Sequence, residues 1–198
     1  MARREAASDR RQAAQDRQAG ASERDKAEHD RDTALADREA SAREREVASH
    51  DGLTGAYLRG PGFVELEREM LRANRTGQPL VVAFVDVDHL KAINDSAGHA
   101  AGDRMLVEVA GAFRANIRSY DLIIRCGGDE FVCAMTGQTR TDATARLELV
   151  NTAIAEATDG SVTVGLAELD PDDSLETLVA RADASLYRQR HQKRHPPA

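Results

Sequence analysis

The chain has 198 residues, a formal net charge of −7 and two cysteines. This length suits one domain of ordinary size with an extension and excludes two large catalytic domains. The acidic balance argues against a general nucleic-acid binder, which needs a basic face for phosphates. No apolar run approaches the roughly 18 residues that span a bilayer, and the start, MARREAASDRR, lacks the apolar core of a signal peptide. We expect a cytoplasmic protein that binds neither nucleic acid nor a membrane.

From residue 6 to about residue 47 the sequence consists almost only of Ala, Arg, Asp, Glu, Gln and Ser, which is typical of a long exposed helix. An acidic residue followed by arginine recurs every seven residues, at Asp9-Arg10, Asp16-Arg17, Glu23-Arg24, Asp30-Arg31, Asp37-Arg38 and Glu44-Arg45. The same register aligns a stripe of small residues. We predict that residues 1–49 form a dimerisation coiled coil. A solvated, partly frayed helix is the alternative, because large apolar residues are missing from the stripe.

After Ser49 aromatic, β-branched and glycine residues appear, as in a globular domain. Apolar spacing predicts helices around residues 63–71, 101–117, 147–154 and 175–186, and strands at residues 79–88, 121–126, 130–135 and 161–169. The order helix, strand, helix, hairpin, helix, strand, helix predicts an α+β fold. We expect an antiparallel or mixed central sheet with helices on one face.

Carboxylates collect at two predicted strand ends. Asp86 and Asp88 end the buried run PLVVAFVDVD, and Asp129 and Glu130 lie in the hairpin turn of RCGGDEF. If the first strand lies beside the hairpin, Asp86 and Asp129 approach each other and repel unless a proton or cation lies between them. Oxygen ligands of this type suit Mg²⁺, which also bridges substrate phosphates.

Gly127 and Gly128 have a role in either interpretation of this turn. Glycine permits the positive φ of a tight hairpin, and it lets backbone N–H groups approach a substrate. Taken alone, the turn is most simply a plain hairpin with solvated carboxylates. Cys126 and Cys133 flank it and form no metal-ligand or disulfide framework.

Five motifs occur in a fixed order: DGLTGAYLR at 51–59, DVDHLKAINDSAGHAAGD at 86–103, RSYDLIIRCGGDEF at 118–131, TVGLA at 163–167 and ADASLY at 182–187. Together they resemble the GGDEF family of diguanylate cyclases over about residues 50–195. The resemblance implies a palm-like sheet with surrounding helices, as in nucleotidyl cyclases, a catalytic domain at 50–195 and a tail at 196–198. It implies an enzyme that joins two GTP molecules into cyclic di-GMP and releases two pyrophosphates.

The resemblance also implies which residues bind metal. Asp86, Asp129 and the carbonyl of Val87 would bind Mg²⁺ or Mn²⁺. Glu130 would be a further ligand or would assist deprotonation of the attacking 3′-hydroxyl, so Glu130 and Asp129 count as catalytic. Charge builds up on phosphate oxygens as pyrophosphate leaves, and metal ions stabilise that charge.

A second group of residues would hold the GTP phosphates. Lys91 matches a family lysine that contacts them and is counted as catalytic, although alone it would be an ordinary surface lysine. Main-chain N–H groups at His89 and Leu90 would donate to the phosphates as well. Near the C-terminus, Arg190 stands for the family lysine, and Arg194 keeps the arginine that binds phosphate.

Two residue pairs would recognise guanine nucleotides. Asn94 and Asp103 match the pair that reads the guanine edge, which would discriminate strongly against adenine. Without the motif, both would pass as helix caps or turn formers. Arg118 and Asp121 form an RxxD five residues before GGDEF, where the family places an inhibitory product site. The simpler interpretation of this pair is a helix-end salt bridge.

One active site would need two GTP-loaded domains that face each other, so the resemblance implies a homodimer. The N-terminal helix would pair the domains and raise their effective concentration. The alternative function is a catalytically silent GGDEF domain that binds GTP or cyclic di-GMP. A third interpretation makes the coiled helix the main function. The intact acidic motif favours the enzyme.

Overall fold

The computed structural model describes residues 46–194 and, before them, residues 31, 33, 35–38, 40, 41 and 44; side chains are described up to residue 192. The described residues that precede residue 50 are helical. Most of the predicted heptad helix lies outside the described residues, so the coiled coil stays a prediction. The chain divides into two compact units between Ala48 and Ser49.

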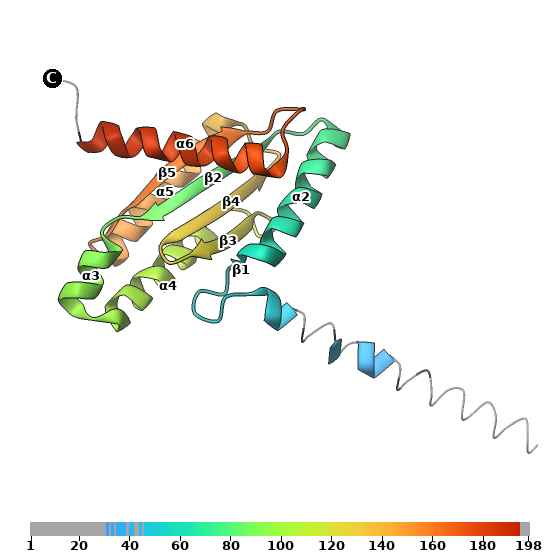
Figure 1. Cartoon of the computed structure of the whole chain (residues 1–198), viewed down its shortest axis with the longest axis horizontal. Helices are drawn as coiled ribbons and strands as arrows, with labels where there is room; N and C mark the ends of the chain where they lie inside the picture. The colour runs from blue at the N-terminus through green and yellow to red at the C-terminus, as the bar shows by residue number, and fades with distance from the viewer. Residues whose placement is uncertain are drawn as a thin grey trace, which may run out of the picture. The chain divides into compact units, whose positions relative to one another are not determined.

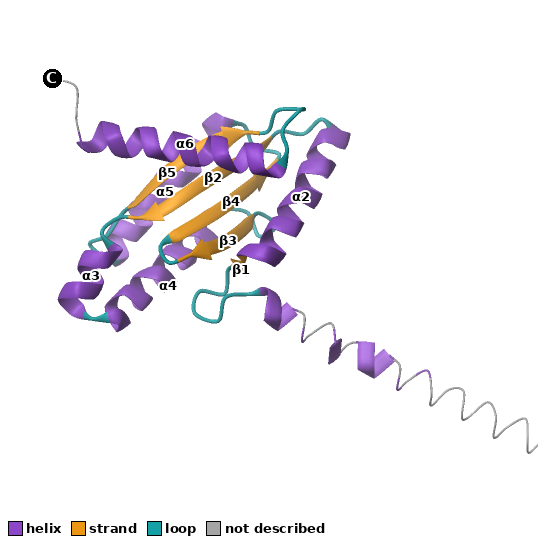
Figure 2. Ribbon diagram, viewed as in Figure 1, coloured by secondary structure: helices purple, strands orange, loops and turns teal. Residues whose placement is uncertain are grey.

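The second unit is built around one mixed sheet (Figures 1 and 2). Its strands are β1 (Tyr57–Leu58), β2 (Leu80–Val87), β3 (Leu122–Gly127), β4 (Glu130–Thr136) and β5 (Val162–Glu168). Its helices are α2 (Arg59–Thr76), α3 (Leu90–Ala97), α4 (His99–Asn116), α5 (Arg140–Ala157) and α6 (Leu175–Arg194). The strand order is β1-β3-β4-β2-β5, with β1 parallel to β3 and every other pair antiparallel. The predicted α+β fold is confirmed; the short β1 and the separate α3 were not predicted.

Helices cover both faces of the sheet, so the expectation of helices on one face was wrong. On one face Val81, Ala83 and Val85 of β2 pack with α4 and α5, and on the other Leu80 and Val82 pack with α2 and α6. Figure 1 shows the same two layers of helices. The physical reason lies in β2, because a central strand that is apolar on both sides must be covered on both sides.

The last helix lies directly on the edge strand of the sheet. A Cβ added to Gly165 in β5 would collide with the backbone of Ala182 and Leu186 in α6. The missing side chain therefore allows α6 to approach β5 closely. This approach carries the second half of α6 to the end of the neighbouring strand β2, where the predicted carboxylates lie.

Candidate active site

The sheet brings two predicted metal ligands together. In the antiparallel pairing of β2 with β4, Asp86 lies directly opposite Glu130. Residues opposite each other in such a pair project from the same face of the sheet. One residue further along, the Val87 N–H donates to the Asp129 carbonyl at 3.0 Å. The strand therefore lies beside the hairpin, and Glu130 rather than Asp129 is the residue opposite Asp86.

The hairpin turn depends on its glycines. Gly127 has φ 153° and Gly128 has φ 46°, and both are exposed. Both angles fall where side chains are rarely tolerated, so another residue at either position would strain the turn. The turn ends at Glu130, the first residue of β4. The two glycines thus set the point at which the acidic pair enters the sheet.

Asp86 already has a cationic partner. Its side chain is only 8% exposed and forms an ion pair with Arg190, whose side chain is 38% exposed. A buried carboxylate without a positive partner would be costly, and the guanidinium of α6 supplies one. Arg190, which the motif assigned to phosphate, therefore contacts the carboxylate assigned to metal.

Asp88 has a different role from Asp86, although both follow the same strand. Its two carboxylate oxygens accept hydrogen bonds from the Ser161 and Thr163 hydroxyls, each at 2.6 Å. These bonds tie the segment after β2 to the start of β5. Thr163 supplies one of the two hydroxyls that this contact needs.

The donor set suits a hard divalent cation. Asp86, Asp129 and Glu130 offer carboxylate oxygens at one strand end, which Mg²⁺ and Mn²⁺ prefer. Arg190 shows that the position attracts positive charge. The described residues contain no cluster of three or more His, Cys, Asp or Glu side chains placed to hold a metal ion. The residues thus fit a cation by their chemistry, and side-chain movement or substrate oxygens would have to complete its coordination.

The start of α3 presents backbone N–H groups next to these carboxylates. His89, at the N-cap, has φ 62°, and among the described side chains none caps the helix there. The first N–H groups of a helix have no partner within the helix and suit phosphate oxygens. Lys91 is exposed in the first turn, and Leu90 is buried and anchors it. The structure thus places three of the five predicted phosphate-binding residues on one turn.

The predicted guanine-reading pair is held by close packing of α3 against α4. A Cβ added to Gly102 would collide with the Asn94 side chain, which would have to move from its place against α4. Asp103 follows Gly102 directly and is exposed, which brings Asn94 and Asp103 to the same helix junction. Sequence reasoning gave Gly102 no role, although its place just before Asp103 in the motif was a usable signal.

The RxxD turn is tightly built around Asp121. This buried carboxylate accepts hydrogen bonds from the Arg118 N–H at 2.9 Å, the Thr136 N–H at 3.3 Å and the Gln138 side-chain amide at 3.2 Å. Burial raises the pKa of Asp121, and the backbone hydrogen bonds from Arg118 and Thr136 only partly offset it. The Arg118 guanidinium donates to the Tyr120 hydroxyl at 2.9 Å. Both motif residues therefore lie together, with Asp121 inside and Arg118 at the surface.

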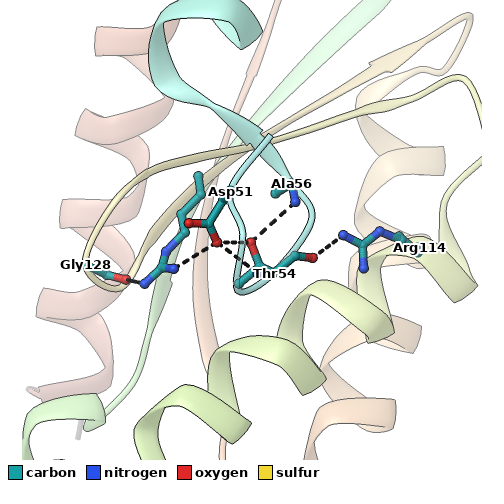
Figure 3. A network of polar contacts seen from close by, with 6 residues as sticks. Asp51, Thr54, Ala56, Arg114 and Gly128 are labelled. Carbon is teal, nitrogen blue, oxygen red and sulfur yellow. Dashed lines mark hydrogen bonds and ion pairs between the residues drawn. The ribbon is translucent and has the colours of Figure 1, made fainter. Parts of the chain in front are cut away.

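Sequence reasoning missed a polar network that ties the DGLTG loop to the hairpin (Figure 3). Asp51 accepts hydrogen bonds from the Thr54 N–H at 2.9 Å and the Thr54 hydroxyl at 2.6 Å, and it pairs with Arg125 at 2.9 Å. Arg125 also donates to the Gly128 carbonyl at 2.9 Å. On the other side of the loop, Arg114 donates to the Thr54 carbonyl. Both motifs were recognised, but a bond between them cannot be inferred from their spacing.

The two cysteines are free and unreactive. Cys126 is half-buried and Cys133 is fully buried. Burial raises the pKa of the Cys126 thiol to about 11, and burial raises the pKa of Cys133 further still. The thiolate is the nucleophilic form, so neither residue serves as a nucleophile at neutral pH. Cys126 and Glu130 line a cavity of about 520 Å³ between α2, α6 and the sheet.

Two predicted positions at the C-terminus are only partly visible. Helix α6 ends at Arg194, but side chains beyond residue 192 lie outside the described part of the structure. The predicted phosphate contact of Arg194 therefore stays a prediction. No helix among the described residues is long and apolar enough to cross a membrane.

Comparison with known proteins agrees with the geometry. A family model described as diguanylate cyclase, GGDEF domain, matches residues 48–196. The chain belongs to this family. Diguanylate cyclase DgcP of Pseudomonas aeruginosa is 36% identical over 146 residues, which cover 70% of this chain and 22% of DgcP. DosC of Escherichia coli K12 is 37% identical over 130 residues, which cover 61% of this chain and 28% of DosC. The chain thus spans between 22% and 28% of these relatives.

A solved structure of a GGDEF protein is also similar to this chain. The coiled coil and GGDEF domain of DgcB from Caulobacter crescentus, in complex with c-di-GMP, matches with a TM-score of 0.73 and 27% identity. The match covers 86% of this chain and 95% of that one. Diguanylate cyclases of the GGDEF family generally use a divalent metal ion.

Proposed function

We propose that the chain is a diguanylate cyclase, which joins two GTP molecules into cyclic di-GMP and releases two pyrophosphates. The observation that carries the proposal is the register of β2 and β4. It sets Asp86 opposite Glu130 at one strand end, beside a guanidinium that marks the position as attractive to cations. The curated relatives are named diguanylate cyclases, which supports the same reaction.

The acidic residues would hold Mg²⁺ or Mn²⁺. Asp86, Asp129, Glu130 and the carbonyl of Val87 supply oxygen donors of the type such ions prefer. When bound, the ion would stabilise the charge on the phosphate oxygens and favour ionisation of the attacking 3′-hydroxyl. Glu130 would orient or deprotonate that hydroxyl. With Asp86 serving as a metal ligand, the Arg190 guanidinium would turn to the phosphates of GTP.

The first turn of α3 would bind the triphosphate. N–H groups near His89 and Leu90 point from an uncapped helix start, and Lys91 adds a full positive charge. Arg194 would add a further contact from the end of α6. In phosphoryl transfer the attacking hydroxyl must be held in line with the phosphate that it attacks. This positioning matters most, because the protein contributes chiefly position and charge.

Asn94 and Asp103 would select guanine at the junction of α3 and α4. The amide can donate to the acceptor edge of the base, and the carboxylate accepts from its N1–H and N2 donors. Adenine would leave both groups without partners, which is costly in a partly buried site. Gly102 supports this selection, because it gives the Asn94 side chain its place.

The reaction would take place across a homodimer. Each domain holds one GTP, so two domains must face each other for each 3′-oxygen to reach the opposite α-phosphate. The N-terminal helix would raise the effective concentration of the domains, and the relative DgcB carries a coiled coil beside its GGDEF domain.

Cyclic di-GMP would inhibit the enzyme at Arg118 and Asp121, and Arg118→Ala should relieve that inhibition.

The direct test is incubation with GTP and Mg²⁺, followed by separation of the products. We expect the wild type to form cyclic di-GMP and Glu130→Ala to lose at least about 100-fold of the rate. Glu148→Ala is the matched control, because Glu148 is an exposed carboxylate on α5. Absence of product from a folded, dimeric wild type would refute the enzyme.

The second candidate is a silent domain that binds GTP or cyclic di-GMP. The ion pair between Arg190 and Asp86 favours it, because a guanidinium on this carboxylate competes with a metal ion. Calorimetry for nucleotide binding, combined with separation of the products, distinguishes the two functions. A silent domain would bind nucleotide with no product after long incubation, even with an excess of Mg²⁺ or Mn²⁺.

A further inference from the structure

The central sheet has two edges, and the two edge strands are built differently. Strand β1 is two residues long, whereas β5 at the opposite edge is seven residues long. Proteins blunt an exposed edge with a very short strand, a lysine, a proline or a bulge. The sequence of β5, VTVGLAE, contains no lysine or proline, and its pairing with β2 runs without a shift in register. The outer side of β5 therefore lacks these protections against another strand.

Every second residue of β5 directs its backbone away from β2. At one end of the pairing the Asp88 N–H donates to the Ser161 carbonyl at 2.9 Å. At the other end the Leu169 N–H donates to the Leu80 carbonyl at 2.8 Å. In an antiparallel pair, residues bonded to the neighbouring strand alternate with residues whose N–H and C=O groups point to the other side. The outward-facing residues of β5 are therefore Val162, Val164, Leu166 and Glu168.

One of these outward groups already has a side-chain partner. The Val162 N–H donates to Asn151 Oδ1 at 3.2 Å, as its outward direction requires. Within residues 46–194, no strand lies opposite the outward groups of Val164, Leu166 and Glu168. Backbone donors and acceptors in folded proteins ordinarily have hydrogen-bond partners. An added strand would supply partners to these three residues.

A groove runs along this outer side of β5. A cavity of about 320 Å³ lies between α5, β5 and α6, and a second cavity of about 180 Å³ shares Arg140 and Leu166 with it. The apolar floor of the larger cavity consists of Leu147, Val162, Val164 and Leu166. Because α5 and α6 cover opposite faces of the sheet, the edge lies between them. Such a groove admits one extended chain, whereas the β5 of a second copy is flanked by the same two helices, which would hold the two edges apart.

The two ends of the groove differ in charge. Arg140, Arg181 and Arg188 line the smaller cavity, and Glu148 lines the larger one. Arg181 is engaged in two ion pairs with aspartates. Arg140 and Arg188 are exposed, and neither forms an ion pair with another described residue. In a chain of formal net charge −7, this positive end favours an acidic group on the occupant.

We propose that the outer side of β5 binds an extended segment of a partner protein as an added antiparallel strand. Its apolar side chains would enter the groove at alternate positions, and an acidic residue would lie next to Arg140 and Arg188. In this mode of recognition, main-chain hydrogen bonds supply affinity, and side-chain pockets supply specificity.

The proposal is independent of the cyclase reaction. None of the groove residues belongs to those assigned to metal, GTP or product. The groove contacts α6 at Gln189, which is next to the Arg190 that pairs with Asp86. An occupant therefore contacts the helix that reaches the candidate active site.

A synthetic peptide, acetyl-ETVTVT-amide, tests the site by titration into the full chain with calorimetry. Run antiparallel to β5, this peptide has its glutamate at the arginine end and both valines facing the groove. We expect saturable binding, and about 5-fold weaker binding when lysine replaces the glutamate. A peptide with proline in place of the first valine lacks one N–H donor and should bind more weakly than the parent.

Variants of the chain test the backbone and the charge separately. Val164→Pro removes an outward N–H and leaves the bonds to β2, which an edge strand tolerates, so we expect peptide binding to be lost. Arg140→Glu combined with Arg188→Glu should reverse the preference, so that the lysine peptide binds about 5-fold more tightly than the glutamate peptide. This charge reversal decides the matter if Val164→Pro does not fold. Arg75→Ala is the control, because Arg75 is exposed in the last turn of α2.

Amide hydrogen exchange, resolved by residue with NMR, distinguishes an added strand from general adhesion. At saturating peptide, the amides of Val164, Leu166 and Glu168 should exchange at least about 10-fold more slowly. The alternate residues of β5 already bond to β2 and should keep their rates.

Three outcomes would overturn the proposal. The first is absence of saturable binding, and the second is undiminished binding by a folded Val164→Pro. The third is self-association of the full chain that Val164→Pro abolishes in sedimentation, which would assign the edge to a second copy. Loss of cyclic di-GMP synthesis would leave the proposal intact, because the peptide is titrated without GTP.

Discussion

Two buried aspartates lie at opposite ends of β4 and are neutralised in different ways. Asp86 lies opposite Glu130, the first residue of β4, and pairs with the long side chain of Arg190. Asp121 accepts a hydrogen bond from the N–H of Thr136, the last residue of β4, and from two further donors. The partner of Asp86 is a long side chain that is 38% exposed. The partners of Asp121 are two backbone N–H groups and one side-chain amide.

This difference separates a carboxylate that is available for chemistry from one that maintains structure. Arg190 can turn to solvent or to a phosphate without unfolding anything, so a cation can take its place at Asp86. The donors around Asp121 cannot move away, because two of them are backbone N–H groups. Burial alone therefore does not distinguish a carboxylate that is open to a cation from one that is held by the fold; the kind of partner does.

Asp86→Asn should show the largest effect of the predictions that test this comparison. The change removes one charge from the proposed metal site with little change in shape, so we expect at least a 100-fold loss of cyclic di-GMP formation, or about 3 kcal/mol in activation free energy. The free energy of unfolding should change by less than about 1 kcal/mol, because Arg190 can reach water. Product separation and urea unfolding measure the two quantities. Full activity in a folded variant would contradict the role of Asp86.

Asp121→Ala should have the opposite profile. It leaves three donors without their acceptor at a buried site, so we expect a loss of about 3 kcal/mol in the free energy of unfolding. Urea unfolding without nucleotide measures this loss apart from any effect on ligand binding. Tyr120→Ala is the control, because the neighbouring side chain is exposed. A loss no greater than that of the control would show that the turn does not depend on Asp121.

Much of the fold could be predicted from apolar periodicity. The residues Met105, Val109 and Phe113 are buried as their helical spacing required, and the long apolar run of β2 is a central strand. One layer of helices was predicted from the sequence, whereas helices cover both faces of the sheet. A continuous apolar run such as Leu80 to Val85 shows that both faces are covered, but it does not show by which helices.

The candidate site was predictable as a set of residues but not as an arrangement. The motif named Asp86, Glu130 and Arg190, yet the ion pair between Asp86 and Arg190 depends on the close approach of α6 to Gly165. The bond between Asp51 and Arg125 joins residues 74 positions apart. Such contacts follow from tertiary packing, which has no period along the chain.

Asp51→Asn should have the smallest effect of these predictions. It is specific because it is followed through pH, and the pKa of Asp51 is lowered whereas the pKa of Asp121 is raised. Partial burial acts to raise the pKa of Asp51, but hydrogen bonds from Thr54 and the bond and charge of Arg125 outweigh it, so the pKa falls below its ordinary 3.8. A lowered pKa stabilises the fold above 3.8, and this stability is lost as pH falls through the folded value. Asp121, with a raised pKa, stabilises the fold below 3.8 and loses that contribution as pH rises.

We therefore expect Asp51→Asn to cost about 1 kcal/mol in the free energy of unfolding at neutral pH, since an amide keeps the Thr54 bonds but loses the charge opposite Arg125. The difference from wild type should shrink as pH falls below 3.8, where the wild-type carboxylate takes up its proton. Thermal unfolding of both proteins across this range measures the trend, with Asp159→Asn as an exposed control. A difference that stays constant into acid would mean that the side-chain geometry of residue 51, rather than its charge, ties the DGLTG loop to the hairpin.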